Sequence, residues 1–341
     1  MRSYNSILGL QLLLAAGIAS GSFTFPMKFT RRWAWENTWL VWTIVALILL
    51  PLLATPIFLP QLREVYSAAG LRPILVLAAF GLAWGAAQVF FGLAVDAIGM
   101  ALAFSIVPGI SLALGSLIPL IRSHSNDLFR AQGLGTMIGV ALTIVGVLVC
   151  ARAGARRESA QLDLKRQQRH SYALGLTLAI SSGFGSAMAN LALVFGAPIV
   201  ESAAKAGANQ LWASLAAWLP MMLAGALPNA SYCLYRLRVN HTAGRFAERK
   251  AWSHWFYASM MAILWFGSMS LYGTAISYLG SWGTVFGWPL FMSLIVITAS
   301  VLGMLTGEWK RSGRRALAMQ LSGVSLLVLA VFELSAASHW L

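Results

Sequence analysis

The residues of this sequence with most scope for chemistry are polar side chains placed in the middle of long apolar stretches. Gln88, Asn190 and Tyr272 are three of them, and a buried amide or phenol needs hydrogen-bond partners from the protein or from a ligand. Neutral amides and hydroxyls suit the hydroxyl groups of a sugar-like molecule, while an aromatic face covers the apolar side of its ring. The pattern therefore predicts a binding site for a small, uncharged, hydroxylated ligand.

Further candidates for this site are hydroxyl and indole side chains in the same stretches. They are Ser20, Thr24, Thr284, Trp84, Trp265 and Trp288. Serine and threonine in membrane helices often bond back to their own backbone or to a neighbouring helix. Trp84 and Trp265 fit two roles equally well, as stacking surfaces beside a ligand and as wedges in a packed core. Ligand contact and packing are both open for this second set.

Ionisable side chains within or beside the apolar stretches are candidates for coupling and gating. Glu333 is an acid inside an apolar stretch, and a carboxylate that changes protonation between two states ties proton flow to a conformational change. The alternative is a carboxylate that reaches the outer interface. Glu36 lies at the start of the second stretch, near Lys28, Arg31 and Arg32. It could form a gate with such a cation as Lys28, or an interfacial ion pair of little energetic weight.

The composition predicts that lipid surrounds most of the chain. Of 341 residues, 59% are hydrophobic and 10% are charged, whereas roughly a quarter are charged in a soluble domain. The formal net charge of +14 comes from basic residues in short loops between apolar stretches, which is how orientation is encoded in a membrane protein. These loops lack the aromatic spacing of nucleic-acid surfaces, so nucleic acid is not an expected partner.

Motifs for catalysis or metal binding are missing from the sequence. It contains no Walker A lysine loop, no HExxH pair and no pair of carboxylates in mid-stretch, which argues against an ATP-driven pump and an integral metalloprotease. The two cysteines, Cys150 and Cys233, have neither metal-binding nor redox spacing. We therefore expect no enzyme activity, no cofactor and no metal.

Ten apolar runs predict ten transmembrane helices, because a run of about 20 residues spans the bilayer as a helix. The first run is expected to be retained rather than removed as a signal peptide. The odd-numbered loops hold 18 of the 24 Lys and Arg residues, which predicts these loops in the cytoplasm and both termini outside. The runs cover residues 5–25, 38–59, 73–95, 100–121, 133–151, 172–194, 211–235, 252–277, 284–306 and 316–338.

Residues 78–109 and 259–290 read as one segment written twice at an offset of 181. The match needs no gap and runs through two apolar stretches and the turn between them. In a membrane protein, such a duplication is typical of transporters built from repeats around a central site. Matching positions include Trp84 with Trp265, Gly92 with Gly273 and Pro108 with Pro289.

The long polar segment in the middle of the chain divides it into two halves of five spans. Residues 1–151 form the first half, residues 152–171 a cytoplasmic linker, and residues 172–341 the second half. Because five is an odd number, the second half must enter the membrane with opposite polarity. The predicted fold is an all-α integral membrane protein of ten helices in two inverted five-helix repeats, with its site near the bilayer midplane.

Three motifs stand out along the chain. They are Phe25-Pro26-x-Lys28-x-x-Arg31-Arg32-Trp33-x-Trp35-Glu36-x-x-Trp39, then Trp84-Gly85 through Gly92 to Gly99-Met100, and Glu308-Trp309-Lys310-x-x-Gly313-Arg314-Arg315. These motifs resemble those of the L-rhamnose–proton symporter family of the drug/metabolite transporter superfamily. They occur in the order expected for that family, and the similarity covers essentially the whole chain.

The resemblance implies a carrier of the bacterial inner membrane that takes up a deoxy-sugar together with a proton by alternating access. The implied partners are a sugar, a proton and the lipid bilayer. Two alternatives are open at this point. One is a carrier for a different sugar or small metabolite, coupled to another ion or to none, and the other is a membrane sensor or enzyme subunit that transports nothing.

Overall fold

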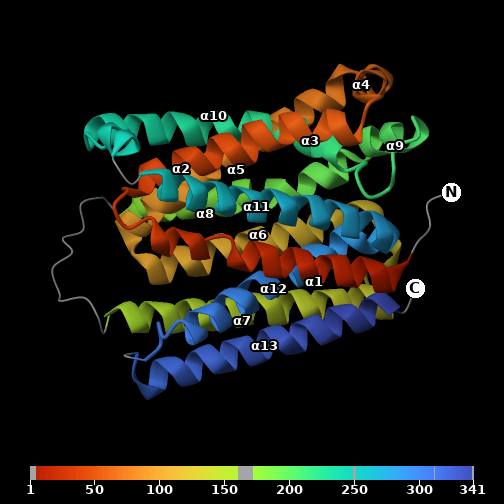
Figure 1. Ribbon diagram of the computed structural model, residues 1–341. Helices are drawn as coiled ribbons and strands as arrows, with labels where there is room; N and C mark the ends of the chain where they lie inside the picture. The colour runs from red at the N-terminus through yellow and green to blue at the C-terminus, as the bar shows by residue number, and fades with distance from the viewer. Residues whose placement is uncertain (1–4, 160–171, 249–250, 311, 340–341) are drawn as a thin grey trace.

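The computed structural model describes residues 5–159, 172–248, 251–310 and 312–339, and within them the chain is helical without a strand. Short 3-10 turns connect several of the helices (Figure 1). The α-helices are α1 (Ser6–Ser22), α2 (Trp35–Ile44), α3 (Leu50–Phe58), α4 (Leu62–Ala69), α5 (Leu71–Ile98), α6 (Met100–Ser123), α7 (Ala131–Ser159), α8 (Tyr172–Phe195), α9 (Ala197–Lys205), α10 (Leu215–Val239), α11 (Ala251–Leu279), α12 (Gly283–Leu305) and α13 (Gly313–His339).

Eight segments of the described residues are long and apolar enough to cross a membrane. One of them, Ala251–Leu305, contains both α11 and α12, joined by a 3-10 turn. Helix α10 has 25 residues but is not among the eight. It carries Asn229, and its last turn contains Arg236 and Arg238, which lower its hydropathy. The joining of α11 with α12 and the omission of α10 account for the difference between eight segments and the predicted ten.

Two short helices occupy places that the sequence predicts as loops. Helix α4 follows α3, helix α9 follows α8, and the two contact each other. Each has apolar residues on one side only, with Val65 buried in α4 and Ile199 buried in α9, so both fit the rim of a larger apolar body. The predicted span at 38–59 is also more complex, because a π-helical segment at Val45–Leu49 joins α2 to α3.

The long helices run back and forth along one axis, and two sides of the bundle follow from this (Figure 1). Helix α1 begins and α13 ends at what we call the terminal side. Helix α7 ends and α8 begins at the opposite, basic side. Helix α5 runs from the terminal side to the basic side and α11 runs the other way. Helix α7 continues to Ser159, and the rest of the predicted linker, 160–171, lies outside the described residues.

Glycines let the long helices approach each other closely. A Cβ added at Gly81 of α5 would lie 2.0 Å from the carbonyl oxygen of Met221 in α10, and one at Gly85 would lie 2.3 Å from that of Gly225. A Cβ at Gly17 of α1 would lie 2.3 Å from Leu294 Cβ in α12. This is the small-xxx-small packing expected between membrane helices, and it holds α5 against α10 and α1 against α12.

Candidate functional site: a cavity on the terminal side

A cavity of about 400 Å³ opens between helices on the terminal side. Its wall comes from α6, α8, α9, α11 and α12, the 3-10 turn between α11 and α12, and Ser214 just before α10, and it combines apolar side chains such as Leu193 and Ile276 with hydroxyls and one carboxylate. A volume of this size suits a monosaccharide-sized ligand. The polar lining residues are Ser123, Glu201, Ser214, Ser277, Ser281 and Thr284.

Asn190 lies next to this cavity and joins four helices. Its Nδ2 atom donates to the carbonyl oxygens of Gly115 in α6 (2.6 Å) and Thr284 in α12 (2.9 Å). Its Oδ1 atom accepts a hydrogen bond of 2.6 Å from the hydroxyl of Tyr272 in α11. Asn190 and Tyr272 are fully buried. The structure thus brings together Asn190, Tyr272 and Thr284, which the sequence predicts as separate ligand contacts. The Asn190 amide binds the Tyr272 hydroxyl and the backbone carbonyl of Thr284.

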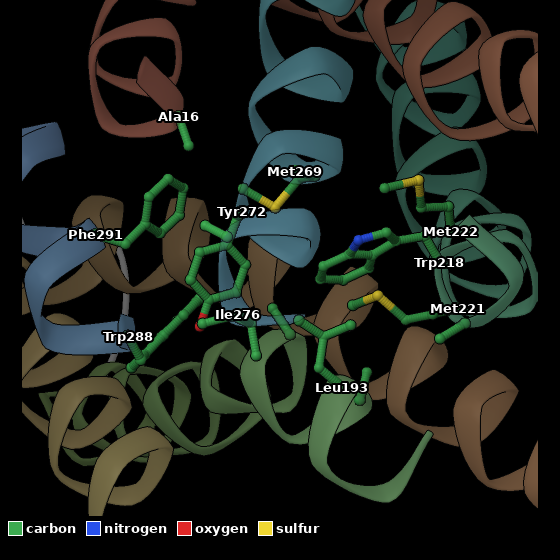
Figure 2. Packing of buried hydrophobic residues seen from close by; sticks show 14 of the residues in the cluster. Ala16, Leu193, Trp218, Met221, Met222, Met269, Tyr272, Ile276, Trp288 and Phe291 are labelled. Atoms are coloured by element: carbon green, nitrogen blue, oxygen red, sulfur yellow. The ribbon is translucent and has the colours of Figure 1, made fainter. Parts of the chain in front are cut away.

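An aromatic wall of α11 and α12 backs this network. The Tyr272 ring lies 4.7 Å from the Phe291 ring and 5.8 Å from the Trp288 ring, measured between centroids. Trp288 Nε1 donates to the carbonyl oxygen of Ser111 in α6 at 3.3 Å. Figure 2 shows Tyr272 turned toward Trp288 and Phe291, on the opposite side of α11 from Trp218. Trp288 therefore has a structural partner and braces α12 against α6.

Trp84 and Trp265 stack on each other at the centre of the bundle. Their ring centroids are 5.4 Å apart with an interplanar angle of 28°, and Trp42 meets Trp265 edge-on at 5.2 Å. Trp84 and Trp265 are each 7% exposed, and neither lines the cavity. Indole rings fill this central region, where the sequence predicts the site, and the cavity lies nearer the terminal side.

The other predicted ligand contacts lie away from the cavity wall. Gln88 is half-buried in α5, one turn past Trp84 toward the basic side, and its amide makes no hydrogen bond with the described residues. Ser20 is buried near the end of α1. Thr24 is exposed after α1, which ends at Ser22. It lies between α1 and the 3-10 helix Phe25–Phe29, inside the apolar segment Ser6–Phe29 that is long enough to cross a membrane.

Ion pairs close the basic side. Lys28, in the 3-10 turn Phe25–Phe29, pairs with Glu308, which follows α12. Arg157 near the end of α7 binds the other carboxylate oxygen of Glu308 at 2.8 Å. Lys28 also donates to the Thr306 hydroxyl at 2.9 Å. We call Lys28, Arg157 and Glu308 the basic-side cluster, and it links residues from both halves of the chain.

Glu36 has different partners from those predicted. Its Oε1 atom accepts hydrogen bonds of 2.8 Å from Asn240 Nδ2 and from the Thr242 hydroxyl, in the segment after α10. The side chain is buried, with 2% exposure. The predicted pairing of Glu36 with Lys28 is therefore wrong: the polar turn after α10 satisfies Glu36, which leaves Lys28 for Glu308. Both carboxylates still tie the two halves together at the basic side.

Glu333 lies on α13, near the end of the helix at the terminal side. A Cβ added at Gly135 in α7 would lie 3.4 Å from Glu333 Oε1, so the carboxylate faces the contact between α7 and α13. It does not line the cavity. Among the described lining residues the one carboxylate is that of Glu201 in α9, a residue that is not among the sequence-based candidates.

Sequence reasoning also missed Glu308, although the motif that contains it was noted. In the sequence, the motif Glu308-Trp309-Lys310 contributes to the family resemblance, and its lysine contributes to the predicted orientation in the membrane. An acid inside a basic loop was the available signal, because such a residue finds cationic neighbours. Ser214 and Gly273 also belong to the cavity wall. No feature of the sequence indicates Ser214, and Gly273 stands out only because it matches Gly92 in the repeat.

Comparison with known proteins agrees with the three motifs. The family model described as L-rhamnose-proton symport protein matches residues 3–337. The chain is 29% identical over 333 residues to an L-rhamnose-proton symporter of Cronobacter sakazakii, with 95% of each chain covered. It is 27% identical over 330 residues to L-rhamnose-proton symporters of Salmonella paratyphi B and Salmonella newport, again over 95% of each chain. The resemblance is confirmed, and the chain belongs to the L-rhamnose-proton symport protein family.

Proposed function

We propose that this protein takes up L-rhamnose together with a proton by alternating access. The observation that carries the proposal is a cavity of monosaccharide size between helices at the terminal side. At the opposite side, the ion pairs of the basic-side cluster hold segments of both halves together. A site near one side, with the two halves held together at the other side, is the arrangement expected of a carrier at one stage of its cycle. Membership of the family supplies the sugar and the ion.

We also propose ten membrane spans in two inverted repeats of five, residues 1–151 and 172–341. The support is that contacts between helices come in matching pairs. Helix α5 packs on α8 as α11 packs on α1, α5 on α10 as α11 on α2, and α6 on α8 as α12 on α1. Helices α6 and α7 pair as α12 and α13 do. Such pairing is expected when two copies of one unit face each other across an axis in the membrane plane.

The proposed location is the bacterial inner membrane, with the basic side in the cytoplasm. Residues of the four basic loops gather at that side, and cytoplasmic loops carry an excess of Lys and Arg. Both chain ends then lie in the periplasm. The cavity faces the periplasm in this arrangement, which is the side from which an uptake system collects its substrate.

Transport by the purified protein tests the function directly. Proteoliposomes are loaded with buffer, given labelled L-rhamnose outside, and energised with an inward proton gradient. We expect sugar accumulation that collapses when a protonophore dissipates the gradient, and alkalinisation of the outside medium during uptake. Accumulation of a different sugar with no L-rhamnose flux would replace the substrate. Absence of any solute flux from folded protein would contradict a carrier function and favour a sensor or enzyme subunit.

Replacement of Glu201 by Gln is expected to uncouple sugar movement from the proton gradient. The substitution replaces the one carboxylate among the described residues of the cavity wall by a neutral amide, and coupling to a proton requires a group that can change its protonation. We expect exchange of internal for external L-rhamnose to continue while gradient-driven accumulation falls at least about tenfold. The same pair of assays on Glu333→Gln provides the comparison. Loss of accumulation in Glu333→Gln alone would move the coupling role to Glu333.

Reversal of the Glu308 charge is expected to open the basic side. Glu308→Lys would place three cations together, and this repulsion disfavours the arrangement in which the basic side is closed. We expect weaker binding of L-rhamnose from the terminal side, with partial recovery when Lys28→Glu is added. Lys310→Glu, at a nearby lysine without an ion pair among the described residues, is the control. Unchanged binding in Glu308→Lys would exclude the cluster as a gate.

The basic-side cluster is expected to be insensitive to pH across the working range. Partial burial acts to raise the pKa of Glu308, but the hydrogen bond and charge of Lys28, followed by those of Arg157, outweigh it and lower the pKa. A lowered pKa means that the contribution is present above the ordinary value and is lost only as pH falls through the lowered one. The effect of Glu308→Gln on binding should therefore be constant between about pH 6 and 8.

A further inference from the structure

A groove of about 630 Å³ lies at the end of α10, on the basic side of the bundle. It is lined by Leu234, Leu237, Arg238, His241 and Ala243. Helix α10 lies at the edge of the bundle (Figure 1), and the side chain of Leu234 is 50% exposed there. The groove therefore has an apolar part along the outer side of the helix and a polar part at the helix end.

Two basic side chains form the polar part of the groove. Arg238 and His241 are exposed, and within the described part of the chain neither side chain makes a hydrogen bond or an ion pair. From Arg236 to Glu248 the chain holds three arginines and one glutamate. Arg238 is always charged, and the imidazole of His241 can donate a hydrogen bond in either protonation state. The polar part of the groove is therefore suited to an anionic group.

The backbone of His241 adds a second observation. His241 has a φ of 53° and is the one residue other than glycine with a positive φ among those that the structure describes. It follows α10 at the position where glycine commonly ends a helix, because the N–H of Thr242 bonds back to the carbonyl oxygen of Leu237 at 3.2 Å. A side chain in this conformation costs free energy that glycine would avoid. A ligand contact of the imidazole accounts for histidine at this position.

We propose that this groove binds an anionic phospholipid, with its headgroup phosphate between Arg238 and His241 and an acyl chain along Leu234. A guanidinium donates two parallel hydrogen bonds to a phosphate group, and an imidazole N–H adds a third. In the proposed orientation the basic side meets the cytoplasmic leaflet, where basic groups attract anionic lipids. Free phosphate would use the two basic side chains but not the apolar part of the groove, so the observations favour a lipid.

The lipid would also act on the contact between the two halves of the chain. Asn240 and Thr242, on either side of His241, both donate hydrogen bonds of 2.8 Å to Glu36 at the start of α2. A lipid that holds the turn after α10 in place therefore stabilises the contact of this turn with the first half. We expect the bound lipid to raise the thermal stability of the protein in the conformation described here.

Native mass spectrometry of the full-length protein in detergent, titrated with phosphatidylglycerol or with phosphatidylcholine of the same acyl chains, tests the site. We expect the parental protein to bind phosphatidylglycerol more tightly than phosphatidylcholine. Arg238→Gln should weaken phosphatidylglycerol binding about fivefold, the effect of one arginine near a membrane surface. Arg314→Gln is the matched control, because Arg314 at the start of α13 is also exposed but does not line the groove.

His241→Gly separates a lipid contact from an effect on folding. Glycine adopts the φ of this position without strain, so the variant should melt in phosphatidylcholine at the parental temperature or above. We expect it to bind phosphatidylglycerol about threefold more weakly, through loss of one hydrogen bond. The extra melting temperature that phosphatidylglycerol gives the parental protein should disappear when His241→Gly is combined with Arg238→Gln.

Three results would overturn the proposal. Equal binding of the two lipids by the parental protein would exclude an anionic site. Equal losses in Arg238→Gln and Arg314→Gln would show a general effect of surface charge without a defined groove. Glycerol phosphate, which has the anionic group without acyl chains, would displace phosphatidylglycerol at equal concentration only from a site for free phosphate. None of these results bears on the carried solute, so the proposed function is tested separately.

Discussion

Asn190→Ala is expected to abolish L-rhamnose binding and to destabilise the protein by about 2 kcal/mol, from three hydrogen bonds worth roughly 0.6–1 kcal/mol each in a membrane protein. The variant leaves the carbonyl oxygens of Gly115 and Thr284 and the hydroxyl of Tyr272 without their partner. Thr284 belongs to the cavity wall, so the loosened contact between α8 and α12 changes the shape of the site. Calorimetric binding and thermal unfolding in nanodiscs measure the two effects.

Asn229 provides a matched control for this substitution. It is a buried amide of α10, 1% exposed, and it too makes three hydrogen bonds. Its Oδ1 atom accepts from Trp39 Nε1, and its Nδ2 atom donates to the carbonyl oxygens of Gly85 and Gly225. Asn229 does not line the cavity. Asn229→Ala should lose similar stability and keep L-rhamnose affinity. If Asn190→Ala also kept its affinity, the amide would hold the helices together without shaping the site.

Gly81→Ala should produce the second large effect, a loss of about 2–3 kcal/mol in stability and loss of transport. The new Cβ would lie 2.0 Å from the carbonyl oxygen of Met221, and backbone cannot move aside as a flexible side chain can. Overpacking in a filled interior typically costs about 1–3 kcal/mol. Helices α5 and α10 belong to different halves of the chain, so forcing them apart disturbs the contact between the halves.

Gly92→Ala, in the same helix, isolates the effect of the close contact. An added Cβ at Gly92 meets nothing within 4 Å, so this variant gains only the higher helix propensity of alanine, about 0.5–1 kcal/mol. Thermal unfolding should show a large downward shift for Gly81→Ala and no loss for Gly92→Ala. Similar melting temperatures for both variants would mean that α5 and α10 are farther apart in the membrane than the structure indicates.

Sequence alone predicted the helices well because one physical constraint dominates them. Lipid requires an apolar, hydrogen-bonded helix for each span, and the predicted runs coincide with long helices to within a few residues at most ends. The short helices α4 and α9 were missed because eight or nine residues give too little periodicity to distinguish a helix from a loop. The π-helical segment at Val45–Leu49 was missed for a different reason, since no local sequence signal specifies it.

The site was less predictable because it depends on which side chains meet. The isolated polarity of Asn190 and Tyr272 showed that each needs a partner, but not that they are partners of each other. The repeat showed that Trp84 and Trp265 are equivalent, but not that they touch. Gly273 and Ser214 both line the cavity, and a volume between helices has no sequence signal. The ion pairs of Glu308 join it to Lys28 and Arg157, and because these segments are far apart in the chain, the sequence alone does not indicate that they meet.

The stacking of Trp84 on Trp265 has a consequence for how motion could be followed. In the proposed pair of inverted repeats these two residues hold equivalent positions, so their contact lies on the axis that relates the two copies. If each half takes up the other's arrangement during the cycle, an on-axis contact keeps its geometry, while off-axis distances such as that from Lys28 to Glu308 change. A pair of spectroscopic probes beside these indoles would therefore keep a constant separation and provide a reference. Probe pairs at the terminal side or at the basic side would change their separation when the protein changes conformation.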